Sequence, residues 1–239
     1  MSYGFKIMIE GDYACFTRPE MKAERVSYDV PTPCALEGLL KSVYWKPAIR
    51  YVIDKIIIFN PINFTNIRKN EIKTKLKINK VKDMISGKKK DISIYADEER
   101  TQKVSTILKN VKYGVEFHFE MTGISSENED EKEEKHYNII KRRLEKGQQF
   151  RTPCLGLREF PVKKIELVND FDLSLIDDKI KSKEIDLGYM SYRINFCEDK
   201  LDKVWEKSIF SDKAKTEYYR PKVVQGVIDV ALYREEIKC

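Results

Sequence analysis

From Val111 to Met121, apolar and polar residues alternate without a fault. Successive side chains of a β-strand point to opposite faces of its sheet, so this period of two predicts a strand with one buried face and one polar face. It is the clearest strand in the sequence. The chain has 239 residues, 41% of them hydrophobic and 35% charged, which is enough apolar material for a core and excludes intrinsic disorder as its main state.

Three further elements are predicted before this strand. Residues Phe5 to Ile9 alternate and predict a first strand. A helix is expected to begin with Thr32 as its N-cap and Pro33 at its first position, and to end at Pro47. Its apolar residues recur at helical spacing on one face: Leu36, Leu39, Leu40, Val43 and Tyr44. The β-branched stretch from Ile49 to Phe59 then predicts a buried strand.

A second helix is predicted after the alternating strand. An acidic run from Glu127 to Glu134 leads into it, and Gly147 ends it. Its inner face is expected to consist of Tyr137, Ile140 and Leu144. The order strand-helix-strand-strand-helix is compatible with a ferredoxin-like sheet that carries its helices on one face, an architecture that RNA-recognition domains often use.

Shorter strands are predicted beyond Pro161, over residues 162–168, 187–196 and a 223–230 hairpin that turns near Gln225 and Gly226. We therefore predict an α+β protein with two domains. The first, residues 1–160, is a ferredoxin-like domain with a basic β-ribbon or long loop inserted at residues 60–90. The second, residues 161–239, is a smaller antiparallel β-sheet domain.

Positive charge is concentrated in the first two thirds of the chain. Residues 65–90 contain ten basic and two acidic residues, and residues 135–151 contain six basic residues and one acidic residue. The last seventy residues are slightly acidic. Such segregation indicates a polyanionic partner such as nucleic acid, although a solvated lysine-rich loop has the same composition.

The sequence argues against several other classes of protein. Its densest apolar run, Ile56 to Phe59, is far short of the roughly 20 residues that span a bilayer, and Lys6 and Glu10 interrupt any N-terminal secretion signal. We therefore expect a cytoplasmic protein. Five scattered cysteines with no CxxC pair, and only two histidines, argue against a zinc site or a disulfide framework. No metal and no cofactor is expected.

Lys135 and His136 are adjacent at the predicted start of the second helix. Cleavage of RNA through its own 2′-hydroxyl needs a base, a cation beside the phosphate and an acid for the departing 5′-oxygen, and needs no metal. Alternatively, His136 is a surface or capping residue, since adjacent helical residues lie about 100° apart. Tyr44 is either a core aromatic whose hydroxyl reaches outward, or a proton donor or phosphate ligand exposed at the helix end. His118, on the polar face of its strand, is expected to have a structural role.

Several segments together resemble one family. They are TRPEMK (17–22), VSYDV (26–30), YWKPAIR (44–50), FTNIRKNE (64–71), HFEMT (118–122), KH (135–136), and GQQFR (147–151) running on to LGLREFP (155–161). In this order they are similar to the fifth Cas family of CRISPR systems, type I-C branch. The similarity covers roughly the first two thirds of the chain. The loop departs from the family's usual residues at Gln149, Arg151 and Cys154.

This resemblance implies a RAMP-type protein that cuts the CRISPR repeat transcript beside its stem-loop without metal. It implies that the protein then stays on the 5′ handle of the RNA, as a subunit of the type I-C surveillance complex. The family's catalytic tyrosine, lysine and histidine fall on Tyr44, Lys135 and His136. RNA binding is assigned to basic residues of the matched segments and the second helix: Arg18, Lys22, Lys46, Arg68, Lys69, Arg142, Arg143 and Arg158.

Three hypotheses follow. The first is a metal-independent endoribonuclease that matures CRISPR RNA and leaves a 2′,3′-cyclic phosphate and a 5′-hydroxyl. In it His136 is the general base, Lys135 stabilises the phosphorane, and Tyr44 positions groups or donates a proton. The second is a catalytically silent subunit that caps the 5′ handle. The third is a general basic protein that binds duplexes, duplex DNA included.

Overall fold

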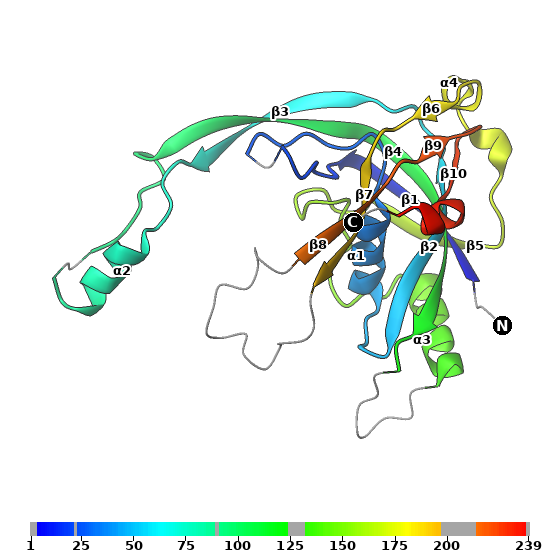
Figure 1. The fold of residues 1–239 in the computed structure, drawn as a ribbon, viewed down its shortest axis with the longest axis horizontal. Coiled ribbons are helices and arrows are strands. Elements are labelled where there is room, and N and C mark those ends of the chain that lie inside the picture. Colours follow the sequence, from blue (N-terminus) through cyan, green and yellow to red (C-terminus); the bar gives the residue numbers. More distant parts are fainter. Residues whose placement is uncertain (1–3, 22, 89–90, 124–131, 197–213, 238–239) are drawn as a thin grey trace.

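The computed structural model describes residues 4–21, 23–88, 91–123, 132–196 and 214–237. Its centre is an antiparallel sheet in which the strands follow the order β10-β2-β4-β1-β5, with β3 paired beside β4 (Figure 1). These strands are β1 (Gly4–Ala14), β2 (Ile49–Ile58), β3 (Phe64–Ile72), β4 (Arg100–Met121), β5 (Lys164–Val168) and β10 (Val227–Asp229). The strands predicted around Phe5, Ile49 and Val111 are therefore confirmed.

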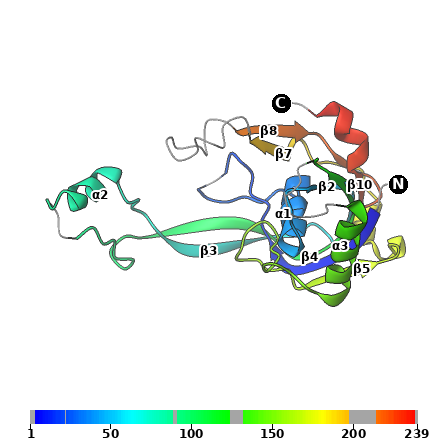
Figure 2. The ribbon, with the colours of Figure 1, turned by 90° about the horizontal axis from the view of Figure 1, so that it is seen from below.

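Two helices connect the strands of this sheet. Helix α1 (Pro33–Val43) links β1 to β2, and α3 (Glu133–Lys146) links β4 to β5. Both lie on the same face of the sheet (Figure 2). A curled antiparallel sheet with helices on one face confirms the predicted α+β class.

The two helices begin and end close to the predicted residues. The Thr32 hydroxyl accepts a hydrogen bond of 3.2 Å from the Ala35 amide, as expected of an N-cap. Helix α1 ends at Val43 rather than at Pro47, because Tyr44 already has extended backbone angles. Helix α3 ends at Gly147, whose left-handed conformation (φ 63°) suits glycine. Of the acidic run before α3, residues 127–131 lie outside the described residues.

The core lies between the sheet and these helices. Ile7 of β1 pairs with Val115 of β4, and both side chains are fully buried. Phe5 stacks on Phe117 at 5.4 Å and on Tyr137 of α3 at 4.9 Å, so an aromatic column joins two strands to the helix. The alternation that predicted β4 therefore marks the face that the helices cover.

The basic insertion is a projecting ribbon. The first half of β4 pairs with β3, and α2 (Ile78–Ile85) lies at the far end of the two strands (Figure 1). A ribbon was one of the two predicted forms of this segment. Helix α2 was not predicted, although Ile78, Val81 and Ile85 recur at helical spacing, because it is short, lies in a lysine-rich stretch and buries none of its residues.

The C-terminal third forms two small antiparallel pairs. They consist of β6 (Ile185–Asp186) with β9 (Lys222–Val223), and of β7 (Met190–Phe196) with β8 (Ala214–Tyr219). Short helices complete it: α4 (Asp178–Lys181) and the 3-10 helices Leu173–Leu175 and Val230–Glu236. The predicted turn is present, with positive φ at Gln225 and Gly226. The boundary after residue 160 stays a prediction, and β5 and β10 from beyond it pair with strands of the main sheet.

Helix α1 contacts both β2 and β7, and β7 with β8 lies on the side of α1 away from β1 (Figure 2). An ion pair links α1 to β7. Arg193 of β7 donates to Glu37 of α1 at 2.6 Å, and the Glu37 side chain is only 7% exposed. Helix α1 is therefore packed on two sides, which fixes the position of the residues at its C-terminal end.

His118 has the structural role expected of it. Its Nδ1 lies 2.7 Å from one carboxylate oxygen of Asp54, and Arg234 donates to the other at 2.5 Å. The pairing of β2 with β4 is irregular at Asp54, as at a β-bulge. This cluster fastens the last 3-10 helix to the sheet.

Candidate active site

Tyr44 ends helix α1 and turns its side chain inward. Its amide still donates to the Leu40 carbonyl, while its own carbonyl accepts from the Tyr51 hydroxyl at 2.8 Å. The Tyr44 side chain is only 4% exposed. Burial raises the pKa of Tyr51 far above its usual range, so Tyr51 stays protonated and remains the donor to this carbonyl.

His136 lies on the first turn of α3 and is fully buried. Its Nδ1 lies 2.9 Å from the Tyr44 hydroxyl oxygen. The imidazole ring also meets the ring of Phe119 edge-on, with centroids 6.4 Å apart. Of the two sequence alternatives, a surface or capping histidine is therefore wrong. The side chain faces the core because it shares the inner face of α3 with Ile140 and Leu144.

The Tyr44 and His136 pair can carry a proton in either direction. When Nδ1 is unprotonated, the tyrosine hydroxyl donates to it, and when the imidazolium forms, Nδ1–H donates to the phenol oxygen. The hydrogen bond therefore links the protonation state of a buried imidazole to a hydroxyl nearer the surface.

Lys135 precedes His136 on the same helical turn and is half-buried. Neighbouring residues on an α-helix point about 100° apart, so the ammonium group and the imidazole leave the helix in different directions. Of the three predicted catalytic residues, Tyr44 and His136 are joined by a direct hydrogen bond.

A cavity of about 660 Å³ opens beside Tyr44. Among the residues that the structure describes, its lining contains cations and aromatic rings and no acidic side chain: Lys41, Tyr44, Trp45, Lys46, Pro47, Arg143, Phe150 and Arg151. Arg143 also lies over the Tyr44 ring, 5.2 Å from its centroid. The proton-carrying pair thus lies next to a positively charged hollow, which is called the aromatic pocket below.

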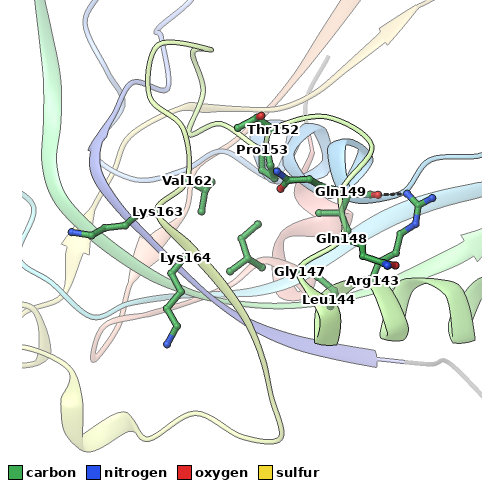
Figure 3. Close-up of a pocket in the computed structure, with 12 residues that line it drawn as sticks. Arg143, Leu144, Gly147, Gln148, Gln149, Thr152, Pro153, Val162, Lys163 and Lys164 are labelled. Atoms are coloured by element: carbon green, nitrogen blue, oxygen red, sulfur yellow. Dashed lines mark hydrogen bonds between the residues drawn. The ribbon is translucent and has the colours of Figure 1, made fainter.

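The carbonyl groups at the end of α1 hold the walls of the aromatic pocket in place. The Ser42 carbonyl accepts from the amides of Phe150 and Arg151 at 2.9 and 3.1 Å, and the Val43 carbonyl accepts from Arg143 at 2.5 Å. Figure 3 shows Arg143 reaching from α3 to make this bond, at the rim of a smaller hollow of about 230 Å³. The helix end thus supplies acceptors to residues from two other segments.

The loop after α3 and helix α1 together line a further hollow of about 570 Å³, whose lining includes Arg151 and Arg158. Gly156 shapes this loop. It has φ of 85°, and a Cβ on it would stand 2.0 Å from the Cys15 carbonyl oxygen. The Leu155 carbonyl accepts a hydrogen bond of 3.0 Å from the Cys15 amide, so the loop packs against the chain just after β1.

The residues predicted to bind RNA fall into separate groups. Lys46 and Arg143 line the aromatic pocket, and Arg158 lines the adjoining hollow. Arg142 is exposed on α3 and Arg68 is exposed on the ribbon.

Three others lie elsewhere. Lys69 forms an ion pair with Glu159 and lies over the Phe160 ring. Arg18 pairs with Asp29 at 3.0 Å and stacks on Tyr28. Lys22 lies outside the described residues.

Four residues that line the aromatic pocket were not predicted as site residues from the sequence: Lys41, Trp45, Phe150 and Arg151. A signal was present for two of them. Trp45 directly follows the apolar stripe of α1 without belonging to it, and Phe150 is an aromatic residue within a polar, glycine-bounded loop beside a basic residue. Aromatic residues interleaved with basic ones are typical of surfaces that bind single-stranded nucleic acid.

In the part of the chain that the structure describes, no three His, Cys, Asp or Glu side chains gather in a way that could hold a metal ion. No helix formed by the described residues is long and apolar enough to cross a membrane.

Comparison with known proteins identifies the family. Residues 4–231 match the family described as CRISPR-associated protein (Cas_Cas5). A protein of Mannheimia succiniciproducens named CRISPR pre-crRNA endoribonuclease Cas5d is 40% identical over the full length of both chains. A protein of the same name from Thermus thermophilus is 34% identical over 81% of this chain and 74% of its own.

Solved structures share the fold. A crystal structure described as a CRISPR-associated protein has a TM-score of 0.63 and 21% identity, over 95% of this chain and 91% of its own. The functionally uncharacterized protein SMU1763c from Streptococcus mutans has a TM-score of 0.60 and 23% identity over the same shares. The family match and the two named relatives establish that the chain belongs to the Cas5 family of CRISPR-associated proteins, type I-C branch.

Proposed function

We propose that this protein is the endoribonuclease that cleaves CRISPR repeat RNA and remains on the 5′ handle as a subunit of the type I-C surveillance complex. Both named relatives are CRISPR pre-crRNA endoribonucleases. The observation that carries the proposal is the 2.9 Å hydrogen bond between Tyr44 and His136 beside a pocket with four cationic side chains. A base and a positively charged phosphate site are what 2′-hydroxyl chemistry requires.

The reaction begins with the phosphate beside Lys46 and Arg143. His136 is the general base, and because its imidazole is buried it acts through Tyr44: the 2′-hydroxyl proton passes to the phenol oxygen as the phenol proton passes to Nδ1. The 2′-oxygen then attacks the phosphorus, and Lys135 stabilises the pentavalent phosphorane. The imidazolium returns its proton through Tyr44 to the departing 5′-oxygen, which leaves a 2′,3′-cyclic phosphate and a 5′-hydroxyl.

The architecture is in keeping with this role. The strand order β2-β4-β1-β5, with α1 and α3 as crossovers, follows the ferredoxin-like pattern that RNA-binding domains use. We infer a RAMP-type domain over residues 1–160, to whose sheet β5 and β10 add strands from beyond the boundary, and a smaller β domain in the rest of residues 161–239. The basic ribbon adds affinity for the RNA backbone, and for duplex DNA, through phosphate contacts.

One observation favours a second candidate. The His136 side chain is fully buried, which also suits a histidine that supports the core of a silent subunit capping the 5′ handle. In that case the protein binds repeat RNA tightly and does not cut it.

The deciding experiment uses the purified full chain and its host's repeat RNA in excess EDTA. A matched RNA carries 2′-deoxyribose at the scissile nucleotide. We expect cleavage of the first RNA and none of the second, with the product ending in a cyclic phosphate. Tight binding of both RNAs without cleavage of either would instead establish the capping role.

A further inference from the structure

Two large aromatic side chains of the aromatic pocket are turned toward solvent. Trp45 is 55% exposed and Phe150 is 79% exposed. They come from different segments, the end of α1 and the loop after α3, and both line the same cavity. Such exposure is unusual for apolar rings, and paired exposed rings typically mark a binding surface.

These two rings are held on a firm base. The Phe150 amide donates to the Ser42 carbonyl of α1 at 2.9 Å, and Trp45 follows directly after the buried C-cap Tyr44. Because the backbone beneath both rings is fixed, a flat ligand that stacks on them has to order only their side-chain torsions.

Every charged side chain among the described lining residues of the pocket is positive. These side chains are Lys41, Lys46, Arg143 and Arg151, and Arg143 lies over the Tyr44 ring. A ligand that suits this pocket therefore has a flat face and a negative charge close to it.

We propose that the aromatic pocket holds one unpaired nucleotide of the RNA, next to the scissile phosphate. The base stacks on Trp45 and Phe150, and its phosphate lies against Lys46 and Arg151. Base stacking on aromatic side chains next to basic groups is how proteins bind single strands, whereas a base inside an A-form duplex cannot offer its face. An acidic peptide would satisfy the cations and leave both rings in water. This inference rests on the proposed function, because it places the nucleotide beside Tyr44.

The test uses repeat RNA made uncleavable by 2′-deoxyribose at the scissile nucleotide. 2-Aminopurine, whose fluorescence falls when it stacks, replaces each unpaired nucleotide around the cut in turn. With the unmodified protein we expect one position to be strongly quenched on binding. The double variant Trp45→Ala/Phe150→Ala should restore emission at that position and weaken RNA binding about 5- to 100-fold. Tyr189→Ala, which removes an aromatic of equal exposure (55%) outside the pocket, should change neither.

Two further variants separate stacking from general apolar contact and from misfolding. Trp45→Phe should keep most of the quenching, and Trp45→Leu should lose it, while both keep the melting temperature of the unmodified protein. If no position is quenched, or if quenching survives the double variant, the inference is overturned. If the double variant does not fold, Trp45→Leu decides in its place.

The readout is independent of catalysis. Quenching that depends on Trp45, in a protein that does not cut all-ribose repeat RNA, would support the nucleotide pocket and overturn the proposed nuclease. Cleavage of the repeat by a protein in which no position is quenched would overturn the pocket and leave the nuclease intact. Displacement of the RNA by an acidic peptide that itself quenches Trp45 fluorescence would overturn the assignment to a nucleotide.

Discussion

The hydroxyl oxygen of Tyr44 and Nδ1 of His136 lie 2.9 Å apart, although 92 residues separate them in the chain. Each residue comes from one of the two helices that cover the sheet: Tyr44 caps the end of α1, and His136 belongs to the first turn of α3. The bond therefore exists only when both helices are docked. Proton transfer between these two residues therefore requires an intact fold.

Removing either partner of this bond should abolish most of the cleavage. Tyr44→Phe and His136→Gln should each lower the single-turnover rate constant about 10²- to 10⁴-fold, the usual contribution of a general acid or base. Each leaves a buried polar group without its partner and should also lower the free energy of unfolding by about 1–3 kcal/mol. Rates measured well below the melting temperature, with circular dichroism alongside, separate the two effects.

The matched control for these variants is Tyr113→Phe, which also removes a buried phenol hydroxyl but from the middle of β4. It should leave the rate constant unchanged. A His136→Gln protein that is folded and fully active would refute the role of His136.

Lys46 should contribute to RNA affinity through a phosphate contact. Lys46→Gln should weaken binding at low salt, and the slope of log K against log salt concentration should fall by about 0.7 for a contact to single-stranded RNA. Fluorescence anisotropy at four salt concentrations measures this slope. Lys181→Gln, on the short helix α4, should leave it unchanged. Equal slopes for Lys46→Gln and the unmodified protein would remove Lys46 from the interface.

Gly156 should tolerate no side chain. Gly156→Ala sets a Cβ against the Cys15 carbonyl oxygen and forces alanine to a φ of 85°, so we expect a loss of at least about 1–3 kcal/mol in unfolding free energy. Gly147→Ala is the control: its φ is also positive, at 63°, but no atom lies within 4 Å of the added Cβ. That variant should lose only about 1 kcal/mol. Urea unfolding of both proteins checks the order, and equal losses would contradict the close approach.

The Arg50 and Glu120 pair should make stability depend on pH. Arg50 donates to Glu120 at 2.5 Å, and this hydrogen bond lowers the pKa of Glu120. A carboxylate with a lowered folded pKa stabilises the protein above its unfolded pKa of about 4.3, and the contribution is lost as the pH falls through the folded pKa. Both side chains are about half exposed, so solvent screening keeps the contribution within about 1 kcal/mol.

The variant Arg50→Met measures this contribution. At pH 7 it should be less stable than the unmodified protein by a few tenths to about 1 kcal/mol, and the difference should shrink as the pH falls below about 4. Urea unfolding at pH 7, 5 and 3 follows it. A difference that stays constant over this range would mean that Arg50 stabilises by packing rather than by charge.

Local patterns in the sequence were sufficient to predict most elements of the fold. Strand β4, the N-cap at Thr32 and the stop at Gly147 all depend on residues close together in the chain, and such signals can be read before anything folds. Helix α2 escaped prediction because it is short and lies in a lysine-rich stretch, so that its apolar period extends over only two turns.

For the candidate active site, the sequence indicated the residues but not their contacts. The family resemblance pointed to Tyr44, Lys135 and His136, but spacing alone left His136 open between a surface residue and a catalytic one. Its burial, and its bond to Tyr44, follow from the docking of α3 beside α1 on the sheet. The aromatic pocket also depends on tertiary structure. The amides of Phe150 and Arg151 donate to the Ser42 carbonyl at the end of α1, and these bonds bring the loop after α3 to the pocket that Trp45 also lines.

Short-range patterns along the chain therefore specify which segments become strands and helices, where the positive charge lies, and which residues carry reactive groups. Tertiary structure decided which of those groups meet. The physical reason is that propensity, capping and alternation act within a few residues, whereas a hydrogen bond across 92 residues forms only after long-range burial has fixed both helices.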